Sequence, residues 1–339
     1  MAVTIKDVAR HAQVSIASVS RVLNRTGVVS EPTRQRVLHA AQYLRYTPHE
    51  AARSLITRRT RTVGVLLPDM HGEYFSELIR GIDRAARLSG LQLLVSSSHG
   101  DEKEAALALR SMYGRVDGVL IMSPYVDAKV LVEPLPSSLP VVLLNTQDTG
   151  GCAASIMIDD FGGAEAMVKH LIAQGRKRIA HITGPDNNYE SNERMRGYRA
   201  ALGRIPICEP TVYAGTFTEE SGYIAGRQIA FANPRPDAVF ASNDMMAIGC
   251  LFALTEVGIR VPADIAVAGF DDIPIARFVS PPLTTVRAQT TELGRQSLEA
   301  LARAINAPGS ERRNSTKLAT QLVIRASCGN TESTVAATL

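Results

Sequence analysis

The sequence predicts a chain with two kinds of fold: an N-terminal all-α unit of the helix-turn-helix type, and a two-lobed α/β body with doubly wound parallel sheets. Three observations predict this. With 339 residues, the chain is longer than one typical domain. Residues 1–62 contain eleven lysines and arginines but three acids, a net charge of +8, whereas the whole chain carries +4. From residue 63 onward, short apolar runs alternate with helical stretches, which is typical of parallel sheets.

The N-terminal unit begins with a capping box, Thr4-Ile5-Lys6-Asp7. Apolar residues at helical spacing follow, Ser15 can cap a second helix that runs to about Leu23, and Ser30-Glu31-Pro32 starts a third. Two short helices joined by a tight turn and closed by a third form a helix-turn-helix. The N-terminal end of the second helix would enter a DNA major groove. The predicted DNA contacts in this unit are Thr4, Ser15, Ile16, Ala17, Ser18, Ser20, Arg21 and Asn24.

A three-helix unit can also bind protein, and a basic face can simply be solvated. The charge of +8 on so small a unit favours DNA, because a basic patch attracts the phosphate backbone.

A second capping box, Thr47-Pro48-His49-Glu50, opens a short helix that runs to about Ile56. A helix this short is marginal alone, so we expect it to form with support from DNA and a partner chain. Leu55 would be an exposed leucine on a basic helix and can insert into a minor groove. The alternative is a linker helix whose leucine packs on its own protein.

The run "TIKDVARHAQVSIASVSRVLN", followed by "VSEPTRQRVLHAAQYLRYTPHEAARSL", resembles the head of the lactose-repressor (LacI) family of bacterial regulators. The resemblance implies that Ser15 to Arg21 form the recognition helix. It implies that Leu55 inserts at the central step of a palindromic operator, with Ala52 and Ser54 beside the DNA. Ile16-Ala17 are both apolar where relatives usually carry base-reading side chains. The operator sequence therefore does not follow from a relative.

In the body, apolar runs and periodic stretches predict alternating strands and helices. The expected strands are Val63–Leu67, Leu91–Val95, Gly118–Met122, Val141–Leu144, Ala154–Ile158, Arg178–Ile182, Ala238–Ala241 and Ile265–Ala268. The expected helices include Glu73–Ser89, Gly162–Gln174, Glu190–Gly203 and Asp244–Val257. About 260 residues exceed one typical domain, so we expect two similar lobes. Ligands of such folds bind beyond the carboxyl ends of the strands.

Motifs such as "EYFSELIRGI", "GRKRIAHITGP", "DAVFASNDMMAIG" and "DIAVAGFDDIP" are similar to the periplasmic-binding-protein-like (type I) body of the same family. The resemblance implies that the chain crosses three times between the lobes, near Asp160, Val286–Gln289 and Ala319, with an effector in the cleft. The expected divisions are a head (1–47), a hinge helix and linker (48–61), an effector-binding and dimerisation body (62–328) and a short tail (329–339).

Strand ends and the resemblance together indicate the cleft residues. Tyr74 and Phe75 would face Phe217 across the cleft, and aromatic faces can clamp a sugar ring or a base. Arg194 matches the family arginine that forks onto ligand oxygens, and Asp271 matches the acid that accepts from ligand hydroxyls. The predicted effector-binding residues are Tyr74, Phe75, Ser123, Asn145, Arg194, Phe217, Asn243 and Asp271.

Each of these residues alone has an ordinary explanation, such as core packing for an aromatic or a helix cap for Asn243. Their joint match predicts a cleft. Ala288 replaces a glutamine common in the family, and Asn188 stands where purine-responsive relatives carry an arginine. A sugar or sugar derivative is therefore the expected effector, by analogy. A phosphoprotein co-effector stays open. A sugar-binding transport protein would need a signal peptide and no basic head.

Other classes of function find no support in the sequence. No nucleophile–base pattern, phosphate loop or metal-ligand spacing occurs, so we expect no enzymatic activity, cofactor or metal. The four cysteines lie far apart in the sequence, at Cys152, Cys208, Cys250 and Cys328. Together with the lack of an apolar signal or membrane segment, this favours the cytoplasm. A palindromic site requires a two-fold homodimer, and the resemblance places helix Glu73–Ser89 in its interface. About ten residues follow "LVIRASCG" without leucine heptads, so a coiled-coil tetramer is not expected.

Overall fold

The computed structural model describes residues 3–24, 27–46, 59–148, 150–203, 210–307 and 314–329. The chain divides into two compact units, Met1–Thr60 and Arg61–Leu339. Most of the predicted hinge lies outside the described residues, including Ala52, Ser54 and Leu55. The predicted tail after Gly329 also lies outside them.

The first unit is a bundle of three helices, α1 (Ile5–Ala12), α2 (Ile16–Asn24) and α3 (Glu31–Tyr43). The capping box forms, because the backbone N–H and the hydroxyl of Thr4 both donate to the Asp7 carboxylate, at 3.0 and 2.7 Å. Small and β-branched side chains fill the core, which lets the helices approach closely. Its buried members are Val8, Ala9, Ala12, Val19, Val22, Val37, Ala40 and Ala41.

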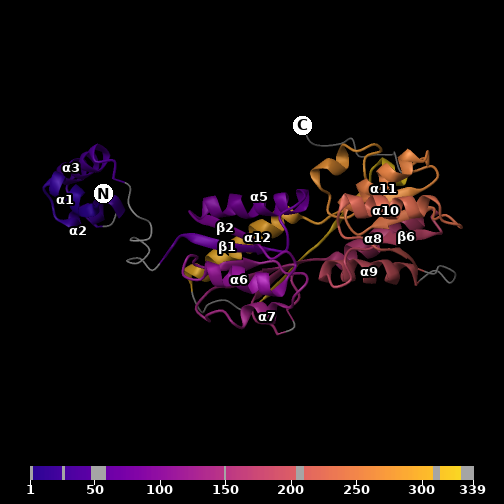
Figure 1. The fold of residues 1–339 in the computed structure, drawn as a ribbon, viewed down its shortest axis with the longest axis horizontal. Coiled ribbons are helices and arrows are strands. Elements are labelled where there is room, and N and C mark those ends of the chain that lie inside the picture. Colours follow the sequence, from indigo (N-terminus) through magenta and orange to yellow (C-terminus); the bar gives the residue numbers. More distant parts are fainter. Residues whose placement is uncertain are drawn as a thin grey trace. The chain divides into compact units, whose positions relative to one another are not determined.

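The first lobe of the body is a six-stranded sheet in the order β11-β5-β4-β3-β1-β2, with every pair parallel. Helices α5 and α12 cover one face, while α6 and α7 cover the other (Figure 1). The strands are β1 (Thr62–Leu67), β2 (Gln92–Ser97), β3 (Val119–Ile121), β4 (Val141–Leu144), β5 (Ala154–Ile158) and β11 (Ser315–Leu318). The helices are α5 (Glu73–Leu88), α6 (Glu102–Met112), α7 (Ala128–Val132) and α12 (Thr290–Asn306).

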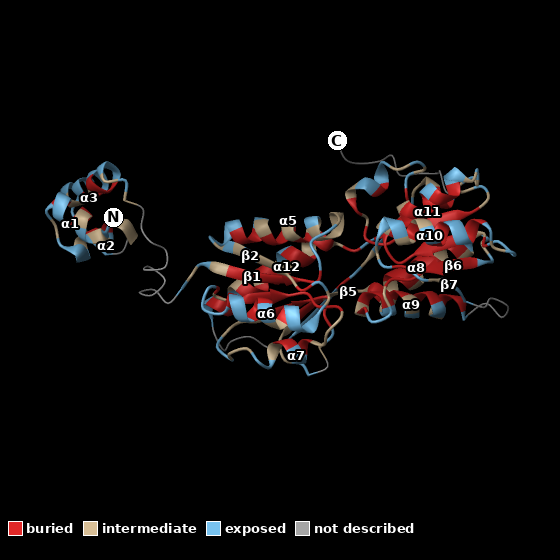
Figure 2. Ribbon diagram, viewed as in Figure 1, coloured by how far each residue is buried: buried red, intermediate tan, exposed pale blue. Residues whose placement is uncertain are grey.

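The second lobe is a four-stranded parallel sheet in the order β7-β6-β8-β9. Helices α8 and α9 pack on one face, and α10 and α11 pack on the other. The strands are β6 (Ile179–Ile182), β7 (Thr211–Tyr213), β8 (Ala238–Ala241) and β9 (Ala266–Ala268). The helices are α8 (Asp160–Ala173), α9 (Tyr189–Leu202), α10 (Glu219–Ala230) and α11 (Asp244–Glu256). Figure 2 shows both sheets as buried layers between helices with exposed outer faces.

The chain crosses between the lobes three times, at the positions expected from the sequence. The first crossing joins β5 to α8, the second follows β10 (Thr285–Arg287), and the third joins β11 to β12 (Gln321–Val323). Strands β10 and β12 pair antiparallel where the chain passes between the lobes. Two 3-10 turns, Pro274–Arg277 and Ala326–Cys328, lie beside these connections.

All eight predicted strands are present, with ends displaced by at most two residues. Four short strands escaped prediction: β7, β10, β11 and β12. Strand β7 lies at a sheet edge and its residues are largely exposed, so it lacks the apolar pattern of a central strand.

Close contact between α5 and α12 depends on a glycine. A Cβ on Gly81 would lie 2.0 Å from the carbonyl oxygen of Thr291, far inside van der Waals contact. This contact fixes α5, whose first turn carries Tyr74 and Phe75. No helix among the described residues has the length and apolar character needed to cross a bilayer.

Candidate effector cavity and DNA-binding surface

A cavity of about 490 Å³ lies between the two lobes, beyond the carboxyl ends of the parallel strands. The first turn of α5 contributes to its wall from the first lobe, and the segments after β7, β8 and β9 contribute from the second lobe. Six of the eight predicted effector residues line it: Tyr74, Phe75, Arg194, Phe217, Asn243 and Asp271.

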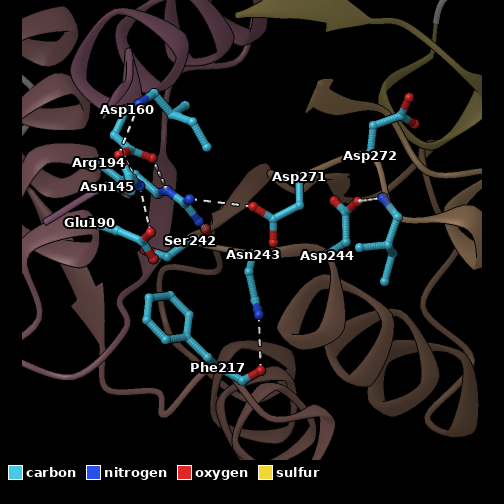
Figure 3. A network of polar contacts seen from close by, with 12 residues as sticks. Asn145, Asp160, Glu190, Arg194, Phe217, Ser242, Asn243, Asp244, Asp271 and Asp272 are labelled. Carbon is cyan, nitrogen blue, oxygen red and sulfur yellow. Dashed lines mark hydrogen bonds and ion pairs between the residues drawn. The ribbon is translucent and has the colours of Figure 1, made fainter. Parts of the chain in front are cut away.

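The aromatic side of the cavity is held by specific contacts. The rings of Tyr74 and Phe75 lie 5.3 Å apart in an edge-to-face arrangement. Phe217 has a left-handed backbone (φ +66°), and its ring lies against Gly184, where a Cβ would come within 2.3 Å of a ring carbon. The amide of Asn243 donates to the Phe217 carbonyl at 2.9 Å (Figure 3). Its oxygen accepts from Met246 N–H at 3.0 Å. Asn243 therefore caps α11 and anchors the aromatic loop.

Arg194 lies at the centre of a buried polar network (Figure 3). Its Nε donates to Asp160 at 2.8 Å and its Nη1 donates to the Ser242 carbonyl at 2.6 Å. The guanidinium also lies 3.9 Å from the centre of the Phe270 ring. The Nη2 atom, 3.3 Å from Asp271 Oδ1, makes no hydrogen bond of normal geometry. Two of the five guanidinium N–H groups, one on Nε and one on Nη1, are thus used within the protein, and the expected contact of Arg194 with ligand oxygens stays a prediction.

Asp271 has an unusual backbone, with φ of +115°, a region that side-chain-bearing residues seldom adopt. Its backbone N–H donates to the carbonyl of Val286 at 2.8 Å, which ties Asp271 to β10 at a crossing between the lobes. Burial raises the pKa of Asp271 well above its usual value, and the Arg194 guanidinium opposes that shift. Strain at such a position is commonly found at functional sites.

Sequence reasoning missed Glu190, which also lines the cavity and is 7% exposed. Burial raises its pKa to about 7 despite the opposing charge of Arg194. An acid in the first turn of a helix usually complements the helix dipole at the surface. No local signal in the sequence shows that Asn145 and Tyr74, which come from the other lobe, enclose Glu190.

The other two predicted residues do not line the cavity. Asn145 is fully buried with φ of +42°. Its amide nitrogen donates to Asp160 at 3.1 Å and to Glu190 at 2.5 Å, while its oxygen accepts from Ile158 N–H. Asn145 therefore positions acidic side chains from behind. Ser123 is buried, and its backbone N–H donates to the Thr146 hydroxyl at 2.8 Å.

Asn188, an expected departure from purine-responsive relatives, lines the cavity and caps α9 by accepting from Ser191 N–H at 2.9 Å. His71 also lines the cavity and is exposed.

On the first unit, the outer face of α2 contains both polar and apolar side chains. Ser15, Ile16, Ala17 and Arg21 are exposed, and Thr4 is exposed ahead of α1. The remaining predicted contacts, Ser18, Ser20 and Asn24, are half-buried. The Ser15 hydroxyl accepts from the backbone N–H of Ser18 at 3.1 Å, so Ser15 caps α2 as predicted.

Comparison with known proteins identifies the family. The model for bacterial regulatory proteins of the lacI family matches residues 4–49, and that for a periplasmic binding protein-like domain matches residues 168–328. The ribose operon repressor of Escherichia coli (strain K12) is 36% identical over 310 residues, which cover 90% of this chain and 94% of the repressor. This chain belongs to the LacI family.

Further LacI-family proteins agree with this. The HTH-type transcriptional repressor PurR of Photorhabdus laumondii is 37% identical over 304 residues, or 88% of this chain and 89% of PurR. The Lac repressor dimer bound to operator and the anti-inducer ONPF has a TM-score of 0.87 and 30% identity, covering 97% of this chain and 99% of that one. The predicted fold class and the prediction of a transcriptional regulator rather than an enzyme are confirmed.

Proposed function

We propose that this LacI-family protein is a repressor that binds a palindromic operator as a homodimer and responds to a sugar or sugar derivative bound between the lobes. The head (1–47) and hinge (48–61) would contact DNA in the cytoplasm, and the body (62–328) would bind the effector and the partner chain. The observation that carries the proposal is the cavity whose walls come from both lobes and contain aromatic rings beside buried polar atoms.

The unsatisfied polar atoms of the cavity suit a hydroxyl-rich ligand. Arg194 Nη2 and Asp271 Oδ1 are buried without a hydrogen bond of normal geometry. A hydroxyl both donates and accepts, so one sugar hydroxyl could bridge these two atoms, which lie 3.3 Å apart, and bond both of them. Leaving such groups unpaired is costly, and a ligand that pairs them gains affinity. The name of the E. coli relative, a ribose operon repressor, supports a sugar.

The cavity disfavours acidic or phosphorylated sugars. Among the described lysines and arginines, Arg194 alone lines it, whereas Asp271, Glu190 and Asp69 all contribute carboxyl groups. A ligand phosphate or carboxylate would add negative charge to a region where burial weakens screening.

The two lobes contact each other beside the cavity, which supplies a route from effector to DNA. Tyr189 N–H, at the start of α9, donates to the carbonyl of Pro124 in the first lobe at 2.8 Å. The hinge leads directly into β1, and Arg61 N–H is fixed to Asp117 at 2.8 Å. A ligand that changes the angle between the lobes would change the separation of two hinges in a dimer, so effector and operator affinities would be reciprocally coupled.

Two exposed leucines of the first lobe support a contact with the partner chain there. Leu88, at the end of α5, is 91% exposed, and Leu94 lies partly exposed on β2, the edge strand of the sheet. The unpaired edge of β2 can also be covered by another chain. The solved Lac repressor is a dimer on its operator.

Operator selection followed by sugar titration tests the proposal. Random duplexes captured by the full-length protein should yield a palindrome, and hexoses, pentoses or amino sugars should change its affinity. Recovery of duplexes without two-fold symmetry, or an affinity indifferent to every sugar class, would contradict the proposal.

A further inference from the structure

Buried carboxyl groups outnumber buried cations around the cavity. Asp160, Glu190 and Asp271 are each more than nine-tenths buried. Arg194 pairs with Asp160 at 2.8 Å and lies 3.3 Å from Asp271. In the part of the chain that the structure describes, Glu190 has no ion pair with a lysine, arginine or histidine. Its hydrogen bond comes from the neutral amide of Asn145, at 2.5 Å. Three acids therefore share one guanidinium.

The same wall contains unpaired donors and acceptors that point to a missing ligand. Arg194 is 2% exposed and Asp271 is 7% exposed, yet Nη2 of the first and Oδ1 of the second lack hydrogen bonds of normal geometry. The buried hydroxyl of Tyr74 lies beside Glu190, and its interaction with that carboxyl group opposes the rise in the Glu190 pKa. All four side chains line the cavity of about 490 Å³. Glu190 therefore lies in a cavity wall that also contains buried polar atoms without a hydrogen bond of normal geometry.

We propose that the effector carries a protonated amino group, that Glu190 accepts a hydrogen bond from it, and that the ligand class is an amino sugar. This inference rests on the proposed sugar effector and narrows it. The ring hydroxyls would contact Arg194 and Asp271, while the ammonium group would neutralise the carboxylate that has no cation partner. A buried carboxylate with a charged donor makes one of the stronger hydrogen bonds in proteins.

The electrostatics of Glu190 agree with this assignment. Burial raises the pKa of Glu190 to about 7, so this group is partly protonated near neutral pH. An ammonium group beside it favours the charged carboxylate, and amine binding would release the proton. A neutral sugar can donate only an uncharged hydroxyl to Glu190, and such a hydrogen bond favours the charged carboxylate less than an ammonium group does.

Matched ligands separate charge from shape. D-glucosamine, D-galactosamine and D-mannosamine are each titrated into the full-length protein by calorimetry, beside the corresponding hexose and N-acetyl derivative. At about pH 6.5 an aliphatic amine of this kind is protonated. At least one amino sugar should bind about tenfold or more tightly than both of its neutral counterparts. The N-acetyl form keeps the nitrogen but loses the charge, so it should lose the preference.

Two variants locate the preference. Glu190→Gln keeps the size and the acceptor for Asn145 but removes the charge, so the amino sugar and its hexose should bind within about threefold of each other. Glu256→Gln removes one charge from the exposed surface of the same lobe and should leave the preference intact. If Glu190→Gln does not fold, as judged by circular dichroism, the comparison of the amino sugar with its N-acetyl derivative on the wild-type protein still decides whether the cavity prefers a charged amine.

The outcomes distinguish this inference from the proposed function. If a neutral hexose or pentose binds and changes operator affinity while no amino sugar binds more tightly than its hexose, the amine assignment is wrong and the sugar effector stands. An amine preference that persists in Glu190→Gln overturns the role of Glu190. If no sugar of any class binds, both proposals fail.

Discussion

The carboxylate of Glu73, at the start of α5 in the first lobe, accepts a hydrogen bond from the backbone N–H of Ile275 in the second lobe at 2.9 Å. This bond spans the two lobes at the same end of α5 that carries Tyr74 and Phe75. The separation of the lobes and the position of the cavity wall therefore depend on one another.

Removing this bond should weaken effector binding more than stability. Glu73→Ala should lower the affinity for the effector severalfold, because an open body must close before it binds. The unfolding free energy should fall by only about 1 kcal/mol, the usual value of one hydrogen bond. Glu77→Ala is the control, since Glu77 bonds Thr291 within the first lobe. Equal losses of affinity in both variants, measured by calorimetry, would contradict a role specific to closure.

Removing the central guanidinium should destabilise the body. Arg194→Met leaves Asp160, Glu190 and Asp271 buried without a cation, and breaking a buried pair in this way costs about 3–5 kcal/mol. The loss should be smaller at pH 5 than at pH 8, because the carboxyl groups can protonate. Urea unfolding at both pH values measures the difference. A loss independent of pH would show that packing rather than charge explains the effect.

Asp244 should make stability depend on pH. It is fully buried, and burial raises its pKa from 3.8 to about 7, although its hydrogen bonds to Thr285 and Ile273 oppose the shift. The folded chain then binds a proton that the unfolded chain has lost, so this contribution to stability is full below about pH 4 and lost as the pH rises through 7.

The free energy of unfolding of Asp244→Asn should therefore rise by about 3 kcal/mol relative to wild type between pH 5 and pH 8. If the substitution also removes a hydrogen bond, the free energy of unfolding changes by the same amount at every pH, so the difference between pH 5 and pH 8 stays the same. The buried His181, whose pKa burial lowers to about 4, has the opposite dependence at lower pH, but it is common to both proteins. Parallel unfolding free energies across this range would refute the assignment.

Leu55 lies outside the described residues, and its role is predicted from the sequence and the family resemblance. Leu55→Ala should weaken binding to a selected operator much more than binding to unrelated DNA, because insertion between base steps depends on a deformed central site. Leu38→Ala removes an exposed leucine from α3 and serves as the control. Gel-shift titrations that show equal losses on both DNAs would rule out insertion.

The exposed α5 face predicts where two chains meet. Leu88→Glu places a charge at a position that is 91% exposed in one chain, so it should leave the fold intact and weaken dimerisation. Leu107→Glu, on α6 across the sheet, offers a matched change at a position 55% exposed. Sedimentation should show a larger monomer fraction for the α5 variant alone. Unchanged dimers in both variants would place the interface elsewhere.

The sequence was most informative where local physics determines the structure. The helices of the first unit follow from their caps and periodicity, and the central strands follow from apolar runs buried on both faces. Tyr74, Phe217 and Asp271 could be predicted because parallel strands place their carboxyl ends at one edge and because the family resemblance matches these positions.

What escaped prediction depends on contacts between distant segments. The end of a strand is visible in sequence, but the direction of a side chain there is not, and Asn145 faces the acids behind the wall. Glu190 reads as a surface acid until the lobes enclose it. The positive φ of Asp271, and the commitment of Arg194 to Asp160 and Ser242, likewise arise only from tertiary packing.

The most direct test of the coupling between cavity and DNA is the operator affinity of the full-length protein with and without a saturating sugar that calorimetry shows to bind. Operator affinity should change by about fivefold or more in either direction. Asp271→Asn, which alters the cavity wall but not the head, should lower the sugar affinity and shift the response to higher sugar concentration. A sugar that fills the cavity of the wild-type protein yet leaves operator affinity unchanged would contradict the account.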